Sequence, residues 1–135
     1  MNHVLLVEDD ELNRTVIEDI IEFDQIAAEL TCVETGEEAL ECARELRPAL
    51  ILMDVGLPGI DGLETTRRLK QTPEVKDTPV WAISAHAMKG DAEQALAVGC
   101  SAYVSKPIDY KQFADRLRTF INQLTMVGEK QCTDC

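Results

Sequence analysis

The sequence predicts an α/β domain with a doubly wound, five-stranded parallel sheet and five helices, in a chain of 135 residues. Short apolar runs alternate along the chain with segments in which apolar residues recur at helical spacing. The run Ala49–Met53 is apolar at every position, which is typical of a parallel strand buried on both faces. Because no repeat or linker interrupts this alternation, we expect one domain over residues 1–124 and a flexible tail over 125–135.

The first half of the chain contains three predicted strands and two predicted helices. Val4–Val7 is a short apolar strand, and Asp10 or a neighbouring residue can cap the helix that follows. The apolar positions of that helix are Leu12, Val16, Ile20 and Ile21. Glu29–Val33 predicts a second strand, and a helix over residues 34–46 precedes the third strand at Ala49–Met53.

The second half continues the alternation. A third helix begins at Gly62, and the polar stretch 71–78 connects it to a strand at Val80–Ile83. The remaining predicted elements are a helix over Asp91–Val98, a short strand at Tyr103-Val104 and a last helix capped by Asp109. The apolar stripe of the last helix consists of Phe113, Leu117, Phe120, Ile121 and Leu124. Strands that alternate with helices in this way predict a parallel sheet covered on both faces.

Charge and hydropathy exclude several classes of protein. The net charge is −12, from 25 acidic and 13 basic residues, whereas binding to nucleic acid depends on Lys and Arg contacts to phosphates. No apolar stretch approaches the ~20 residues that cross a membrane. The amino terminus lacks the basic and long apolar segments of a signal peptide. We therefore expect a cytoplasmic protein that binds neither nucleic acid nor membrane.

Five cysteines are present, and their odd number and irregular spacing do not indicate a disulfide framework. Cys32, Cys42 and Cys100 lie in apolar contexts, which predicts small buried side chains. Cys132 and Cys135 have the spacing of a redox motif but follow no strand–helix unit. A solvated tail is the simpler interpretation of this pair, and a metal or thiol switch is the alternative.

Acidic residues follow two strands that a doubly wound sheet places side by side. Glu8 and Asp9 follow the first strand, and Asp54 follows the third. Carboxylates this close together repel each other unless a proton or a cation intervenes. Mg²⁺ prefers such oxygen ligands. We expect Asp9 and Asp54 to bind it directly, Glu8 to act through water, and the backbone carbonyl of Gly56 to be a further ligand.

Ser84 follows the fourth strand and Lys106 follows the fifth, and these two residues complete a set suited to phosphoryl chemistry. The Lys106 ammonium group can pair with Asp54 at rest and with a phosphoryl oxygen later. The Ser84 hydroxyl group can hydrogen-bond to the same oxygen. A carboxylate nucleophile, a divalent cation and a lysine indicate phosphoryl transfer to Asp54. Each residue alone is more simply explained as a cap or a turn residue, so the interpretation depends on their occurring together, in order, at the strand ends.

The four strand ends resemble the site of receiver domains of two-component response regulators. The resemblance covers residues 2–124 and is carried by Glu8-Asp9, by Asp54 followed by Leu57-Pro58-Gly59, by Ser84-Ala85 and by Lys106-Pro107. It implies a flavodoxin-like topology with strand order 2-1-3-4-5. The stretches 7–13 and 87–91 are most similar to single-domain DivK-type regulators.

The resemblance also implies roles for individual residues. Asp54 is the phosphoacceptor, Asp9 and Asp54 hold Mg²⁺, and the phosphoryl group is contacted by Lys106, Ser84 and the neighbouring Ala85. The peptide bond before Pro107 is a candidate for the cis form.

Further positions are implied to switch or tune the domain. Tyr103 rotates inward on phosphorylation, although a tyrosine that packs beneath the last helix in both states is an alternative. Gly56 and His86 tune the lifetime of the phosphoryl group, unless His86 is an exposed bystander. The output surface is expected at the fourth helix, last strand and last helix, near Ala95, Tyr103 and Phe113.

The sequence therefore predicts a phosphorylation-controlled interaction module and not a turnover enzyme. Its partners would be a sensor histidine kinase or histidine phosphotransfer protein and a downstream protein target. A phosphorelay intermediate that passes the group onward remains an alternative. A Mg²⁺-dependent phosphatase of the haloacid-dehalogenase type is disfavoured, because such enzymes have a second Asp two residues after a nucleophile on the first strand. Flavodoxin-like cofactor binding is disfavoured by the three acids after the first strand, which repel phosphate.

Overall fold

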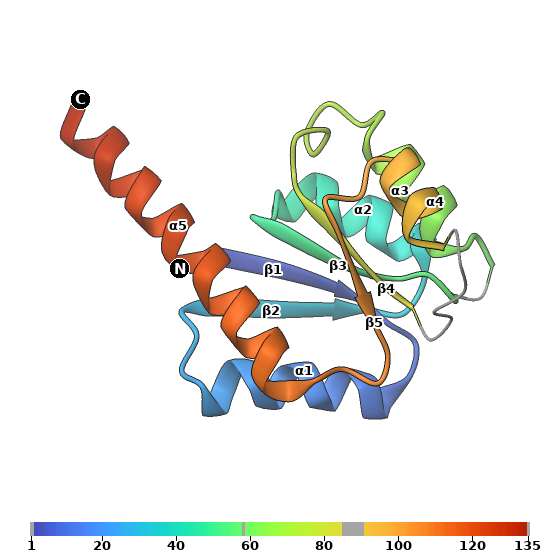
Figure 1. Ribbon diagram of the computed structural model, residues 1–135. Coiled ribbons are helices and arrows are strands. Elements are labelled where there is room, and N and C mark those ends of the chain that lie inside the picture. Colours follow the sequence, from blue (N-terminus) through green and yellow to red (C-terminus); the bar gives the residue numbers. More distant parts are fainter. Residues whose placement is uncertain (1, 58, 85–90, 135) are drawn as a thin grey trace.

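The protein is a five-stranded parallel sheet with helices on both faces, as the computed structural model of residues 2–57, 59–84 and 91–134 shows (Figure 1). The strand order is β2-β1-β3-β4-β5, which confirms the predicted fold class and topology. The strands are β1 (Asn2–Val7), β2 (Ala28–Val33), β3 (Leu50–Asp54), β4 (Val80–Ser84) and β5 (Ala102–Ser105). The helices are α1 (Glu11–Phe23), α2 (Gly36–Leu46), α3 (Gly62–Leu69), α4 (Asp91–Ala97) and α5 (Tyr110–Asp134).

Side-chain caps fix the start of four helices. Asp10 accepts a hydrogen bond from the Leu12 amide and so begins α1, as the sequence predicts. Thr35 accepts from the Glu38 amide at the start of α2, and the Thr35 hydroxyl also donates to the Glu38 carboxylate. The caps of α3 and α5 are Asp61 and Asp109. Each cap satisfies an amide that the helix itself leaves without a partner.

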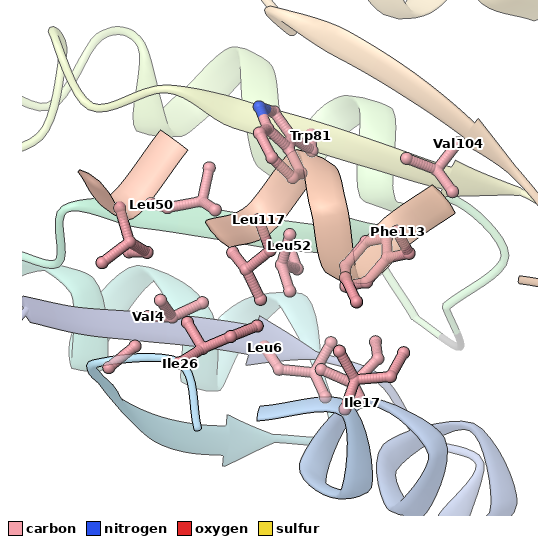
Figure 2. Packing of buried hydrophobic residues seen from close by; sticks show 14 of the residues in the cluster. Val4, Leu6, Ile17, Ile26, Leu50, Leu52, Trp81, Val104, Phe113 and Leu117 are labelled. Carbon is pink, nitrogen blue, oxygen red and sulfur yellow. The ribbon is translucent and has the colours of Figure 1, made fainter. Parts of the chain in front are cut away.

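Two apolar clusters lie on opposite faces of the sheet. One cluster packs α1 and α5 against the sheet, and the other packs α2, α3 and α4 against the opposite face (Figure 1). In the first cluster Trp81 of β4 lies over Phe113 and Leu117 of α5 (Figure 2). All five residues of β3 are buried. This two-sided burial explains why β3 is apolar up to its final residue.

The buried face of α1 differs from the one we expected. Ile17 and Ile20 are its buried residues, whereas Leu12 is 77% exposed and Val16 is 37% exposed. Ile21 is partly buried against the same cluster. The spacing of Leu12 and Val16 predicted the helix correctly but not its buried face, because adjacent apolar residues on a helix allow two overlapping stripes and the packing with α5 selects only one.

Helix α5 continues past the point where we expected a tail. It runs without interruption to Asp134, and its last turns project beyond the sheet (Figure 1). The stretch 125–131 contains Met, Glu, Lys and Gln, which favour helix, and Gly128 costs only about 1 kcal/mol within it. Cys132 therefore lies in a helix, and Cys135 is outside the described residues.

The other cysteines agree only in part with their prediction. Cys100 is buried, whereas Cys32 and Cys42 are partly exposed. Burial raises the pKa of all three thiols, and nearby carboxylates raise it further for Cys32 and Cys42. A raised pKa disfavours the thiolate, which is the reactive form of a cysteine. Separately, no helix within the described ranges has both the length and the apolar character to span a bilayer.

Candidate functional site

The carboxyl ends of the strands bring the predicted acids and the lysine together. Register pairs Val7 of β1 with Met53 of β3, so Glu8 and Asp54 follow at the same level of neighbouring strands. Asp54 is the last residue of β3 and is 6% exposed, and Glu8 is 2% exposed. Lys106 follows β5, where its amide donates to the carbonyl of Ser84 at 2.8 Å. As predicted, Glu8, Asp54 and Lys106 therefore lie together at this edge of the sheet.

Lys106 lies between the two buried carboxylates. Its Nζ atom is 3.0 Å from Oε1 of Glu8 and 3.4 Å from Oδ1 of Asp54. The same Asp54 oxygen accepts a hydrogen bond from the Gly56 amide at 3.0 Å. The expected pairing of Lys106 with Asp54 is present, but the shorter contact is with Glu8. The ammonium group thus holds both acids in place.

Glu8 retains its proton far more strongly than an ordinary glutamate. Burial, and after it the hydrogen bond and negative charge of Asp54, raise the pKa of Glu8 from 4.5 to about 7, although Lys106 opposes both effects. Within the described part of the chain, Oε2 of Glu8 is buried and has no hydrogen-bond partner. A buried carboxylate oxygen without a partner is costly. A proton or a cation at this oxygen would remove that cost.

Lys106 keeps its charge in this setting. Burial alone would lower the pKa of Lys106, but the hydrogen bond to Glu8 and the negative charges of Asp54 and Glu8 outweigh that effect and raise it. The lysine is 15% exposed. An ammonium group at this position remains available to bind an anionic oxygen placed near Asp54.

Three carboxylates fit a small divalent cation. One oxygen each from Glu8, Asp9 and Asp54 lies within 4.8 Å of the other two. Asp9 is exposed, whereas its two partners are buried, so the cluster opens to solvent on one side. Hard oxygen ligands beside open positions suit Mg²⁺, which retains several waters. The donor set and the unpartnered oxygen of Glu8 thus agree with the predicted cofactor.

The structure describes only some of the remaining predicted residues. Ser84 is buried at the end of β4, directly beside Ser105 of β5. Tyr103 is half-buried against the cluster that packs α2, α3 and α4 on the sheet. The Lys106-Pro107 peptide bond is cis, as the resemblance implies. Ala85 and His86 lie outside the described residues.

The structure also shows two contributors that we did not predict. A Cβ atom on Gly62 would collide with the carbonyl of Asp54, so α3 begins directly against the end of β3. Arg14 of α1 donates a hydrogen bond to the Glu8 carbonyl at 3.1 Å. Each contact brings the first turn of a helix back against the end of the strand before it. A glycine at a helix start is a recognisable signal, but an arginine within an amphipathic helix is not.

Known proteins share both the sequence and the architecture. Residues 4–118 match the response regulator receiver domain. The polar-differentiation response regulator DivK of Brucella anthropi is 45% identical over 118 residues, which are 87% of this chain and 94% of that protein. The corresponding DivK of Brucella ovis is 44% identical with the same coverage.

Solved structures add the spatial comparison. The receiver domain of a sensor histidine kinase from Pseudomonas aeruginosa, with magnesium coordinated in its active-site cleft, is 33% identical at a TM-score of 0.79. The match covers 90% of this chain and 98% of that domain. The chemotaxis response regulator CheY4 of Vibrio cholerae shares the fold at 23% identity and a TM-score of 0.80, over 89% of this chain and 98% of that protein. The chain therefore belongs to the family of response regulator receiver domains.

Proposed function

We propose that Asp54 accepts a phosphoryl group from a histidine kinase or a histidine phosphotransfer protein, and that this modification switches a protein-interaction surface. The observation that carries the proposal is the Asp54 carboxylate at the end of β3, between the ammonium group of Lys106 and a cluster of carboxylates. Family membership and the similarity to DivK proteins support it. The domain promotes its own phosphorylation and dephosphorylation and does not act as a turnover enzyme.

The transfer step uses residues of this site directly. A carboxylate oxygen of Asp54 forms the new bond to phosphorus, while the bond between phosphorus and the donor histidine nitrogen breaks and leaves its electron pair on that nitrogen. Lys106 is placed to neutralise charge on a phosphoryl oxygen, since its Nζ lies 3.4 Å from Asp54. The Gly56 amide orients the Asp54 carboxylate. The protein thus contributes position and counter-charge.

Magnesium is the proposed cofactor. Asp9 and Asp54 would hold it together with the Gly56 carbonyl, and Glu8 would act through a bound water. When bound, Mg²⁺ supplies positive charge to the oxygens of the phosphoryl group during transfer. The carboxylate cluster of this chain and the magnesium in the related Pseudomonas domain support this assignment.

The output surface would lie on α4, β5 and α5. Ser84 would move toward the phosphoryl group, and Tyr103 would turn inward. Ala95 and Phe113, which we expected near this surface, are buried in opposite apolar clusters. Exposed neighbours such as Leu96, which is 55% exposed on α4, are therefore better candidates for contact with a downstream target.

The acceptor assignment is tested by labelling with a small phosphodonor such as phosphoramidate in the presence of Mg²⁺. We expect the intact mass of the protein to increase by one phosphoryl group, and hydroxylamine to remove it as from an acyl phosphate. Asp54→Asn should abolish the gain. Asp77→Asn is the matched control, because Asp77 is exposed in the connection that precedes β4. Labelling of Asp54→Asn to the same extent as wild type would reject Asp54 as the acceptor.

A further inference from the structure

The backbone of Glu8 is held from two directions. Its amide donates to the Val33 carbonyl at the end of β2, at 3.0 Å. Its carbonyl accepts from Nη1 of Arg14 in α1 at 3.1 Å, and the same nitrogen donates to the carboxylate of Glu34 at 3.2 Å. Because Glu34 directly follows Val33, these contacts form a closed loop around Glu8. Arg14 is 19% exposed, whereas Glu34 is 63% exposed.

The carbonyl that Arg14 binds belongs to the peptide unit between Glu8 and Asp9. A peptide unit is planar, so holding its oxygen restricts rotation of the whole unit. The Cα atoms at its two ends carry the Glu8 and Asp9 side chains, which supply two of the three carboxylates in the cluster. Arg14 itself is not a member of that cluster. The hydrogen bond from Arg14 therefore influences the site by fixing the directions in which the Glu8 and Asp9 side chains extend from the backbone.

We propose that Arg14 is a positioning residue for the divalent cation site, and that Glu34 anchors it. The guanidinium group holds the Glu8–Asp9 peptide unit in the orientation at which both carboxylates reach the same point as Asp54. This inference rests on the proposed function, since it takes Mg²⁺ as the ligand of the cluster. Outer partners that orient metal ligands typically change metal affinity by about 10–100-fold when they are removed.

A purely electrostatic role for Arg14 has the opposite sign. A positive charge near three carboxylates repels an incoming cation, so its removal would strengthen Mg²⁺ binding. Loss of a positioning contact instead weakens binding, because the acids no longer converge. The sign of the change in affinity therefore separates the two roles.

The test measures Mg²⁺ binding by isothermal titration calorimetry for the wild type, Arg14→Gln, Arg14→Lys and Arg44→Gln. Arg44→Gln is the matched control, because it removes the same charge from α2, where Arg44 lies 3.7 Å from Glu74. We expect Arg14→Gln to bind about tenfold more weakly than wild type. Arg14→Lys should recover most of the affinity, since an ammonium group can also donate to a carbonyl and a carboxylate. Arg44→Gln should bind like wild type.

The possible outcomes separate the inference from the proposed function. Binding by Arg14→Gln that equals or exceeds that of Arg44→Gln overturns the positioning role while the cation site stands. Absence of Mg²⁺ binding in the wild type rejects the site and this inference with it. If circular dichroism shows that Arg14→Gln is unfolded, Glu34→Gln is compared with Glu41→Gln, which removes an equal charge from the exposed face of α2. Weaker binding by Glu34→Gln supports the anchor, and equal binding overturns it.

Discussion

Glu8 has a pKa of about 7 in the folded protein, against an ordinary value of 4.5. The folded state therefore holds a proton between these pH values that an unfolded chain has released. Stability consequently falls as the pH rises from about 4.5 to 7, provided that no cation occupies the site. A cation that binds the carboxylates must displace this proton. Below about pH 7, binding of a cation at the carboxylates is therefore coupled to release of the proton from Glu8.

The first prediction concerns the pH dependence of Mg²⁺ affinity. We expect the affinity to rise as the pH increases toward about 7 and to level off above it, because Glu8 is then already ionised. Well below pH 7 the slope should approach tenfold per pH unit, as expected for release of one proton. Calorimetry in buffers of different ionisation enthalpy measures the protons released. Glu8→Gln is the control and should lose this slope, so an unchanged slope in that variant would assign the proton to another group.

At the scale of the helices and strands, α3 depends on a glycine at its start. A Cβ atom on Gly62 would overlap the backbone carbonyl of Asp54 and the Cα of Val55, neither of which is a flexible side-chain end. We expect Gly62→Ala to lower the free energy of unfolding by about 1–3 kcal/mol, as overpacking does. It should also weaken Mg²⁺ binding, because relief of the overlap moves Asp54.

Gly56→Ala is the matched control for this prediction. A Cβ atom on Gly56 meets nothing nearer than Oδ1 of Asp54, at 3.8 Å, and Gly56 is exposed. Chemical denaturation should therefore find Gly56→Ala close to wild type. A Gly62→Ala protein as stable as Gly56→Ala would contradict the close approach of α3 to β3.

The elements were predictable to the extent that local chemistry determines them. Apolar runs identified the strands, and Asp10 and Asp109 identified two helix starts. The choice between the faces of α1 was not predictable, because Val16 and Ile17 are adjacent and only the packing with α5 selects Ile17. The helix beyond Leu124 was also missed, since a helical backbone needs favourable propensity but no apolar stripe.

In the candidate site, too, local sequence predicted some features, and others depend on tertiary packing. Asp54 and Lys106 were recognised because each follows an apolar run, and parallel strands end at one edge. The contact of Lys106 with Glu8 at 3.0 Å, shorter than that with Asp54, depends on the path of β5 and has no sequence signal. The hydrogen bond from Arg14 to a backbone carbonyl has none either, because a carbonyl is present at every residue.

At the scale of the whole molecule, Trp81 links the site to α5. Its ring makes edge contacts with Phe113 and Phe120, with centroids 6.2 and 5.5 Å away, and the guanidinium of Arg116 lies 5.3 Å above it. Trp81 is on the same strand as Ser84, three positions earlier. A shift of Ser84 would therefore be transmitted to the contact between β4 and α5.

The chain contains one tryptophan, so its fluorescence reports on this contact alone. We expect the emission of Trp81 to change when Mg²⁺ and beryllofluoride, a mimic of the phosphoryl group, bind at Asp54. Asp54→Asn should give no response to beryllofluoride. Fluorine NMR shows independently whether the mimic is bound. Constant emission in wild-type protein that has bound the mimic would contradict transmission through β4.

The contact between Lys106 and Glu8 joins residues 98 positions apart. Glu8 follows the first strand, Asp54 ends the third and Lys106 follows the last. Both acids are therefore synthesised well before the lysine that neutralises them. The ends of β1 and β5 meet only after nearly the entire domain has closed into one loop. It follows that a chain truncated before β5 lacks the positive charge that lies between Glu8 and Asp54. Charge balance at this edge of the sheet is thus a property of the completed domain, because it needs the ends of the first, third and last strands together.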